Sequence, residues 1–85
     1  MAVRVRMFTT LICPYCIRAK MLLKSKGVAY EEIDVTGDKE MRAWLVATTG
    51  RRTVPQIFIG EESIGGFHEL RDLDRAGELA KKLAA

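Results

Sequence analysis

Cys13-Pro14-Tyr15-Cys16 follows the alternating run Val3-Arg4-Val5-Arg6-Met7-Phe8 and opens a segment of helical periodicity that continues from Ile17 to Lys26. Two cysteines separated by two residues at a strand-to-helix junction are typical of a redox dithiol. The junction predicts Cys13 at the N-cap and Pro14 at the first helical position, where the missing proline N–H would have had no partner. The free N–H groups and the positive end of the helix dipole would favour a thiolate at Cys13.

This placement predicts that Cys13 is the attacking thiol and that Cys16, one turn further along and less exposed, is the resolving thiol. Three alternative roles for the cysteine pair are weaker. A zinc site needs four ligands, and the soft donors of the chain are Cys13, Cys16 and His68, so we expect no metal. A structural disulfide would close a loop too short to restrict the unfolded chain much. Two ordinary core cysteines fit poorly with Pro14-Tyr15 between them.

Size and composition limit the function classes. The 85 residues fit a single domain, 1–85, with one core, and the 48% hydrophobic content is typical of a globular chain. The net charge of +3 comes from scattered basic residues without interleaved aromatics, so we expect a small anionic substrate and no nucleic acid. Arg4 and Arg6 interrupt the first twelve residues, which predicts neither a signal peptide nor a membrane span. We expect a cytoplasmic monomer, in which a cysteine pair is more often catalytic than structural.

Hydrophobic spacing and turn residues predict the order βαβαββα. The second strand should be parallel to the first because a helix separates them, and Pro55 should stand at the very start of the third strand. The expected elements are strands over 3–8, 29–35, 54–59 and 62–64, and helices over 14–26, 38–49 and from 67 to the C-terminal end. The apolar faces of the helices comprise Cys16, Ala19, Leu22 and Leu23; then Met41, Trp44, Leu45 and Thr48; and then Phe67, Leu70, Leu73, Ala76, Ala80 and Leu83. Trp44 is expected in the core.

With these motifs in place, the chain resembles the glutaredoxins over nearly its whole length, and it is close to the bacterial dithiol type. The resemblance rests on Cys13-Pro14-Tyr15-Cys16, on Thr53-Val54-Pro55-Gln56-Ile57-Phe58-Ile59 and on Gly65-Gly66. It implies an α/β, thioredoxin-like fold with a mixed four-stranded sheet and flanking helices. It also implies a glutathione-dependent enzyme that reduces protein disulfides and glutathione mixed disulfides. Glutathione would be a co-substrate, and no cofactor would be tightly bound.

The resemblance further implies a glutathione groove beside Cys13. Pro55 should follow a cis peptide bond, leaving the Val54 backbone to pair with the cysteinyl part of glutathione; a trans proline at a strand edge is the alternative. Arg51 or Arg52 would hold the glycine carboxylate, unless both are simply solvated charges. The groove would be completed by Tyr15, Thr53, Gly65, Gly66, Phe67 and His68.

Two positions depart from the family pattern. Thr10 stands where many relatives carry a lysine, which removes a positive charge near Cys13. His68 replaces the acidic residue usually found two places after Gly-Gly, with Glu69 next, so the contact with the glutathione amino group is in doubt. We favour a surface or helix-start histidine over a catalytic base.

Two further functions are compatible with this fold. One is a dithiol donor to ribonucleotide reductase that is itself reduced by a thioredoxin reductase. The second is a binding module in which Cys13 of two chains and two glutathiones hold an iron-sulfur cluster. Retention of the groove motifs argues against the first, and the proline after Cys13 argues by resemblance against the second.

Overall fold

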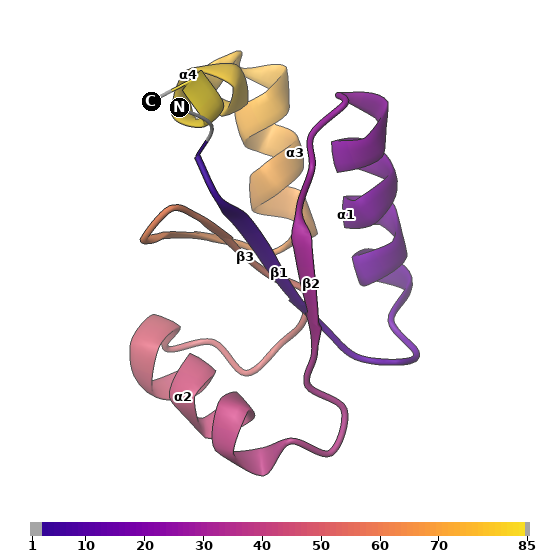
Figure 1. Ribbon diagram of the computed structural model, residues 1–85, viewed down its shortest axis with the longest axis vertical. Coiled ribbons are helices and arrows are strands. Elements are labelled where there is room, and N and C mark those ends of the chain that lie inside the picture. The colour runs from indigo at the N-terminus through magenta and orange to yellow at the C-terminus, as the bar shows by residue number, and fades with distance from the viewer. Residues whose placement is uncertain (1–2, 85) are drawn as a thin grey trace.

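The computed structural model describes residues 3–84, in which four strands form one mixed sheet with the order β2-β1-β3-β4. Figure 1 shows α1 and α3 on one face of this sheet and α2 on the other. The strands are β1 (Val5–Thr9), β2 (Glu31–Asp34), β3 (Gln56–Ile59) and β4 (Glu62–Gly65). The helices are α1 (Pro14–Ser25), α2 (Lys39–Thr49), α3 (Phe67–Arg75) and α4 (Glu78–Ala84).

The strand pairing follows from the connections. β1 pairs in parallel with β2, as predicted for strands joined through a helix, and antiparallel with β3, which forms a hairpin with β4. Strand β1 is therefore central, with both faces covered toward its carboxyl end, where Met7, Phe8 and Thr9 are all buried. The dithiol follows directly from this buried end of the strand.

Two apolar clusters hold the layers together. On one face Met7 and Ile57 of the sheet pack with Leu23 of α1 and Leu70 of α3. The cluster on the other face is smaller, and in it Phe8 and Phe58 pack under Leu45 of α2. Helix α1 contributes the apolar stripe that the sequence predicts, with Ala19, Leu22 and Leu23 packed against the sheet, because the helix buries a single face.

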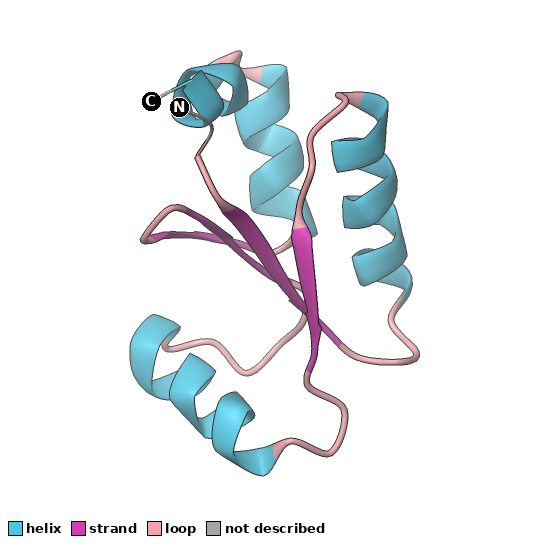
Figure 2. Cartoon of the chain, in the orientation of Figure 1, coloured by secondary structure: helices cyan, strands magenta, loops and turns pink. Residues whose placement is uncertain are grey.

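The last helix was predicted as one segment, and this prediction is wrong. Helix α3 ends at Arg75, and Gly77 adopts a positive φ of 75° before α4 begins at Glu78, so the order is βαβαββαα. Figure 2 shows the short loop between the two helices. The break shifts the helical phase: Leu79 is buried, whereas Ala76 and Ala80, expected on the apolar face, are exposed.

Helix α2 also departs from its predicted apolar face. Trp44 contacts the rings of Phe8 and Phe58, with centroids 5.9 and 6.0 Å away, yet it remains 41% exposed at the margin of the cluster. Thr48 is exposed, and Leu45 is the buried residue of this helix. Helix α2 fully buries only Leu45, so Trp44 and Thr48 remain in contact with solvent. None of the helices within residues 3–84 is long and apolar enough to cross a bilayer.

Candidate functional site: a dithiol beside a cationic pocket

The dithiol lies where α1 begins. Cys13 is the N-cap with extended backbone angles, and Pro14 occupies the first helical turn, as predicted. The Cys13 sulfur accepts a hydrogen bond from the Cys16 backbone N–H at 3.1 Å, and a disulfide joins Cys13 to Cys16. Cys16 is 1% exposed and Cys13 is 8% exposed, so Cys13, the N-cap residue, is the more accessible of the two cysteines.

Opposing dipoles act on the Cys13 sulfur. The Cys16 N–H and the positive end of α1 stabilise negative charge there, and no acidic residue lies in the first turn to oppose them. The Val54 carbonyl oxygen lies 3.7 Å from the same sulfur and could accept a hydrogen bond only from a protonated thiol. The carbonyl thus favours the thiol, whereas the helix start favours the thiolate.

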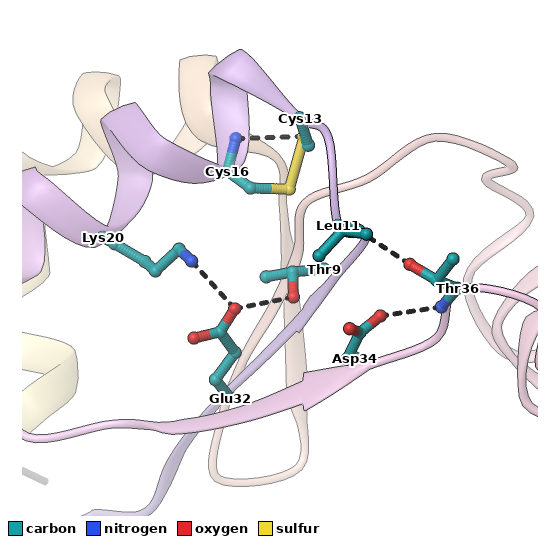
Figure 3. Close-up of polar contacts among 8 residues, drawn as sticks. All are labelled: Thr9, Leu11, Cys13, Cys16, Lys20, Glu32, Asp34 and Thr36. Carbon is teal, nitrogen blue, oxygen red and sulfur yellow. Dashed lines mark hydrogen bonds and ion pairs between the residues drawn. A yellow bond between two sulfur atoms is a disulfide. The ribbon is translucent and has the colours of Figure 1, made fainter.

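A polar network lies beneath the dithiol (Figure 3). Glu32 Oε2 accepts hydrogen bonds from Thr9 Oγ1 at 2.8 Å and from Lys20 Nζ at 2.9 Å. The hydrogen bond from Lys20, together with that from Thr9, holds the pKa of Glu32 below its ordinary value, and the bond to Glu32 raises the pKa of Lys20. These contacts tie α1 to β1 and β2 one turn after Cys16.

The loop before the dithiol is anchored separately. The Leu11 backbone N–H donates to Thr36 Oγ1 at 2.8 Å, and the Thr36 N–H donates to Asp34 Oδ1 at 2.8 Å (Figure 3). The hydrogen bond from the Thr36 backbone lowers the pKa of Asp34. The segment that leads into Cys13 is thus fixed to the end of β2.

The segment 51–55 forms a second side of the site. The Val54–Pro55 peptide bond is cis, which confirms that prediction. The buried Gln56 side chain donates to the Arg51 carbonyl oxygen at 2.9 Å and accepts from Thr49 Oγ1 at 2.9 Å. This amide fixes the turn between α2 and β3, and with it the position of Val54 beside Cys13.

The two glycines at the start of α3 serve different contacts. A Cβ on Gly66 would lie 3.3 Å from the Pro55 carbonyl oxygen, so glycine permits the close approach of the two loops. Gly65 has a φ of 109°, and a Cβ there would lie 2.8 Å from Glu69 Oε1. The space at Gly65 therefore accommodates Glu69 of this chain.

Glu69 joins the two loops, a role that the sequence did not suggest. Its Oε1 accepts from the Gly66 N–H at 2.7 Å and pairs with Arg51 Nη1 at 3.1 Å. The hydrogen bond from Gly66 is the main cause that lowers the pKa of Glu69, with the Arg51 charge contributing. The only local signal was an acidic residue three positions after the N-cap, as in a capping box.

Aromatic contacts bring α1 and α3 together. Tyr15 stacks on Phe67 with ring centroids 6.4 Å apart and lies 5.3 Å from the His68 ring. His68 is exposed, as favoured from the sequence. Phe67 and His68 are the first two residues of α3, so their N–H groups belong to the free donors of a helix start.

A pocket of about 250 Å³ lies between α2 and the segment before β3. It is lined by Arg51, Arg52, Thr53 and Val54, all predicted glutathione contacts, and also by Arg42. Arg42 was not predicted because it lies about two turns before the end of α2, and only the fold brings it beside Arg51. Within residues 3–84, Arg42 and Arg52 make no ion pair, and no group of three or more His, Cys, Asp or Glu could hold a metal ion.

A vicinal dithiol at the start of the helix that follows the central strand, in a thioredoxin-like fold, defines a thiol-disulfide oxidoreductase. Comparison with known proteins narrows this class. The glutaredoxin family model matches residues 5–64, and the chain belongs to the glutaredoxin family.

Similar sequences and similar solved structures support this family membership. A glutaredoxin of Pseudomonas aeruginosa is 53% identical, covering 92% of this chain and 93% of its own. Glutaredoxin 3 of Escherichia coli is 47% identical, with 88% and 90% covered. The crystal structure of a buckwheat glutaredoxin–glutathione complex superposes with a TM-score of 0.87 at 34% identity, covering 96% of this chain and 77% of that one. The solution structure of a Brucella melitensis glutaredoxin gives 0.86 at 44% identity, covering 96% and 89%. The protein is thus a glutathione-dependent dithiol oxidoreductase.

Proposed function

We propose that Cys13 is the nucleophile of this oxidoreductase and Cys16 its resolving thiol, acting on glutathionylated proteins and on protein disulfides. The observation that carries the assignment is the Cys16 N–H bound to the Cys13 sulfur at the helix N-cap. This donor and the helix dipole stabilise a thiolate at Cys13, whereas Cys16 is buried one turn inside.

The reaction follows from these positions. The Cys13 thiolate attacks the glutathionyl sulfur of a mixed disulfide, and the protein thiolate leaves and takes up a proton. A second glutathione thiolate then attacks the glutathionyl sulfur on Cys13, which yields glutathione disulfide and restores the Cys13 thiolate. Alternatively, the Cys16 thiolate attacks the Cys13 sulfur, expels glutathione and forms the Cys13–Cys16 disulfide. With a protein disulfide, the Cys13 thiolate attacks one sulfur and the other leaves as a thiolate that stays within the substrate. The Cys16 thiolate then attacks the Cys13 sulfur and expels the remaining substrate thiolate, and two glutathiones reduce the Cys13–Cys16 disulfide to restore the dithiol and yield glutathione disulfide.

For glutathione we propose the groove between segment 51–55 and the start of α3. The Val54 backbone would pair with the cysteinyl unit, since its carbonyl oxygen is already beside the Cys13 sulfur. The pocket lined by Arg42, Arg51 and Arg52 suits the glycine carboxylate, because guanidinium groups bind carboxylates in charge-assisted hydrogen bonds. The N–H groups of Phe67 and His68 would receive the γ-glutamyl carboxylate, and Tyr15 would border the groove. The monomeric state and the cytoplasmic location stay predictions.

Separate replacement of the two cysteines tests these roles. Cys13→Ser should lower kcat/KM by at least about a thousandfold with both kinds of substrate, as expected for loss of a nucleophile. Cys16→Ser should retain most activity on a glutathionylated peptide and lose the reduction of an intramolecular protein disulfide. Assays should supply either glutathione with its reductase or a thioredoxin reductase as the sole electron source. Equal residual activity of the two variants on the glutathionylated peptide would contradict the assignment.

A further inference from the structure

Exposed apolar side chains gather around the dithiol. Among residues 3–84, every large hydrophobic side chain that is strongly exposed, Trp44 excepted, lies between positions 11 and 21. Leu11 is 78% exposed and Ile12 is 88% exposed, immediately before Cys13, and Ile17 and Met21 follow on α1 at 56% and 64%. We refer to Leu11, Ile12, Ile17 and Met21 as the apolar rim. Clustered exposure of this kind marks an interaction surface.

The apolar rim is held in place. The Leu11 N–H donates a hydrogen bond to Thr36 Oγ1, and the Thr36 N–H donates one to Asp34 Oδ1 (Figure 3). These hydrogen bonds anchor the loop that contains Leu11 and Ile12. The Ile17 N–H donates to the Cys13 carbonyl oxygen at 3.1 Å, which places Ile17 one helical turn after Cys13 and directly after Cys16. Met21 follows after four more residues on the same side of the helix. A fixed surface loses little conformational freedom when it binds.

The apolar rim lies away from the glutathione groove. Tyr15 points toward Phe67 and His68 at the start of α3. Ile17 is two residues further on, which is more than half a turn around the helix axis. The mixed disulfide that Cys13 attacks has a glutathione half and a protein half, so a glutathione half in the groove leaves the protein half on the side of the apolar rim.

The charges near the apolar rim favour an acidic partner. The sequence contains no acidic residue before Glu31, whereas Arg18, Lys20, Lys24 and Lys26 all lie on or just after α1. Lys20 pairs with Glu32 and Lys26 with Asp74. Within the described part of the chain, Arg18 and Lys24 make no ion pair, and the Arg18 guanidinium lies 5.4 Å from the centre of the Tyr15 ring. Lys24, three residues after Met21, therefore borders the apolar rim as a cation without an acidic partner, whereas the Arg18 guanidinium lies against Tyr15.

We propose that the apolar rim docks the protein half of the substrate and selects cysteines whose neighbours are apolar, with acidic residues just beyond them. The inference rests on the proposed role of Cys13. When Cys13 attacks the glutathionyl sulfur, the departing protein sulfur is still bonded to that same sulfur. The residues that flank the substrate cysteine therefore come close to Leu11 and Ile12, which directly precede Cys13 in the chain. Apolar contact then supplies affinity, and the cationic border supplies orientation and a faster encounter with an acidic partner.

Three substrates separate docking from chemistry. They are glutathionylated cysteine alone, a glutathionylated peptide with Leu and Val beside the cysteine and Glu further out, and the same peptide with Ser in place of Leu and Val. The double variant Leu11→Ser/Ile12→Ser should raise KM for the apolar peptide by about tenfold, equivalent to about 1.4 kcal/mol of binding. KM for the other two substrates and kcat for all three should stay within about twofold.

Controls make the result specific. Ala47→Ser changes an exposed residue of α2 on the far side of the sheet and should leave all three substrates unaffected. Ile17→Ser should have a smaller effect than the double variant, and exchanging Glu for Lys in the apolar peptide should raise KM more at low than at high salt. Far-ultraviolet circular dichroism and thermal midpoints would check that the variants fold.

Two outcomes would overturn docking while leaving the chemistry intact. One is a wild-type KM that does not distinguish the apolar from the Ser-flanked peptide. The other is a double variant that slows all three substrates equally, which would mean that Leu11 and Ile12 affect only the reactivity of Cys13. Failure of the wild-type protein to turn over glutathionylated cysteine would instead contradict the proposed function itself.

Discussion

At the scale of single residues, Glu69 connects the two loops that border the proposed glutathione groove. Its carboxylate caps the start of α3 through the Gly66 N–H and also pairs with Arg51. The pairing engages one nitrogen of the guanidinium and leaves its other donors available for the pocket. With His68 at the preceding position, the acid nearest to Gly65-Gly66 is thus committed to contacts within the protein.

Replacing Glu69 should therefore weaken binding more than chemistry. Glu69→Ala removes the cap and releases Arg51, so KM for a glutathionylated substrate should rise by a factor of about 3 to 10, with kcat nearly unchanged. The free energy of unfolding should fall by about 1 kcal/mol, as for loss of a helix cap. Steady-state kinetics and urea unfolding measure the two effects.

A double-mutant cycle gives the control. In an Arg51→Ala background, Glu69→Gln should raise KM little further, because the pair is already broken. Glu78→Gln, which removes a surface partner of Lys81, should change neither KM nor stability appreciably. A lower KM in Glu69→Gln would show that Glu69 competes with the substrate for Arg51.

At the scale of the elements, Gly77 divides what the hydrophobic spacing predicted as one helix. Its φ of 75° lies in the left-handed region, and no atom lies within 4 Å of a Cβ built on it. A larger residue at position 77 would therefore be disfavoured by its backbone conformation and not by crowding from neighbouring atoms. The break allows α4 to bury Leu79 in the same cluster as Leu70 of α3.

Gly77→Ala should lower the free energy of unfolding by about 1 kcal/mol, because a Cβ disfavours the left-handed conformation. Gly77→Asn should lose less, since asparagine tolerates that region best among the residues that carry a Cβ. Urea unfolding of the two variants would measure the difference. Alanine as stable as glycine would mean that α3 and α4 can merge without loss of the Leu79 packing.

At the scale of the whole molecule, carboxylates with lowered pKa values link stability to pH. Hydrogen bonds lower the pKa of Glu32, Asp34 and Glu69, chiefly from Lys20, the Thr36 backbone and the Gly66 backbone respectively. Each contributes stability that is complete above the pKa of the unfolded chain, about 4, and is lost as pH falls through the lower folded value. Lys20 has the opposite sign: its raised pKa contributes stability that is lost only as pH rises through the folded value.

The urea midpoint should therefore be nearly constant from about pH 6 to 8 and fall as pH drops below about 4. Glu32→Gln should be less stable than the wild type at neutral pH and should lose less on acidification, because one of the linked carboxylates is gone. Glu61→Gln provides a comparison, since Glu61 is an exposed turn residue for which no ion pair lies within residues 3–84. An acid loss in Glu32→Gln as large as that of the wild type would contradict the linkage.

Local patterns were sufficient for much of this molecule. The helix start at Cys13, the stripe of Cys16, Ala19 and Leu23, and the parallel pairing of the first two strands all followed from spacing, capping and connection rules. Such rules act within one or two turns of the chain. The resemblance added the cis bond before Pro55, which the structure confirms, and a set of glutathione-groove residues that stays a prediction.

Contacts between distant segments are different, and no local pattern encodes them. Arg42 joins Arg51 and Arg52 because the chain turns back after α2, and Glu69 reaches Arg51 because Gly66 approaches Pro55. The exposure of Leu11 and Ile12 has the same origin. Hydrophobicity alone predicts burial for both, but the anchored loop turns their side chains away from a core that Met7 and Leu23 already fill. Burial depends on which segments cover a residue, and that is decided only when the sheet and its helices have packed.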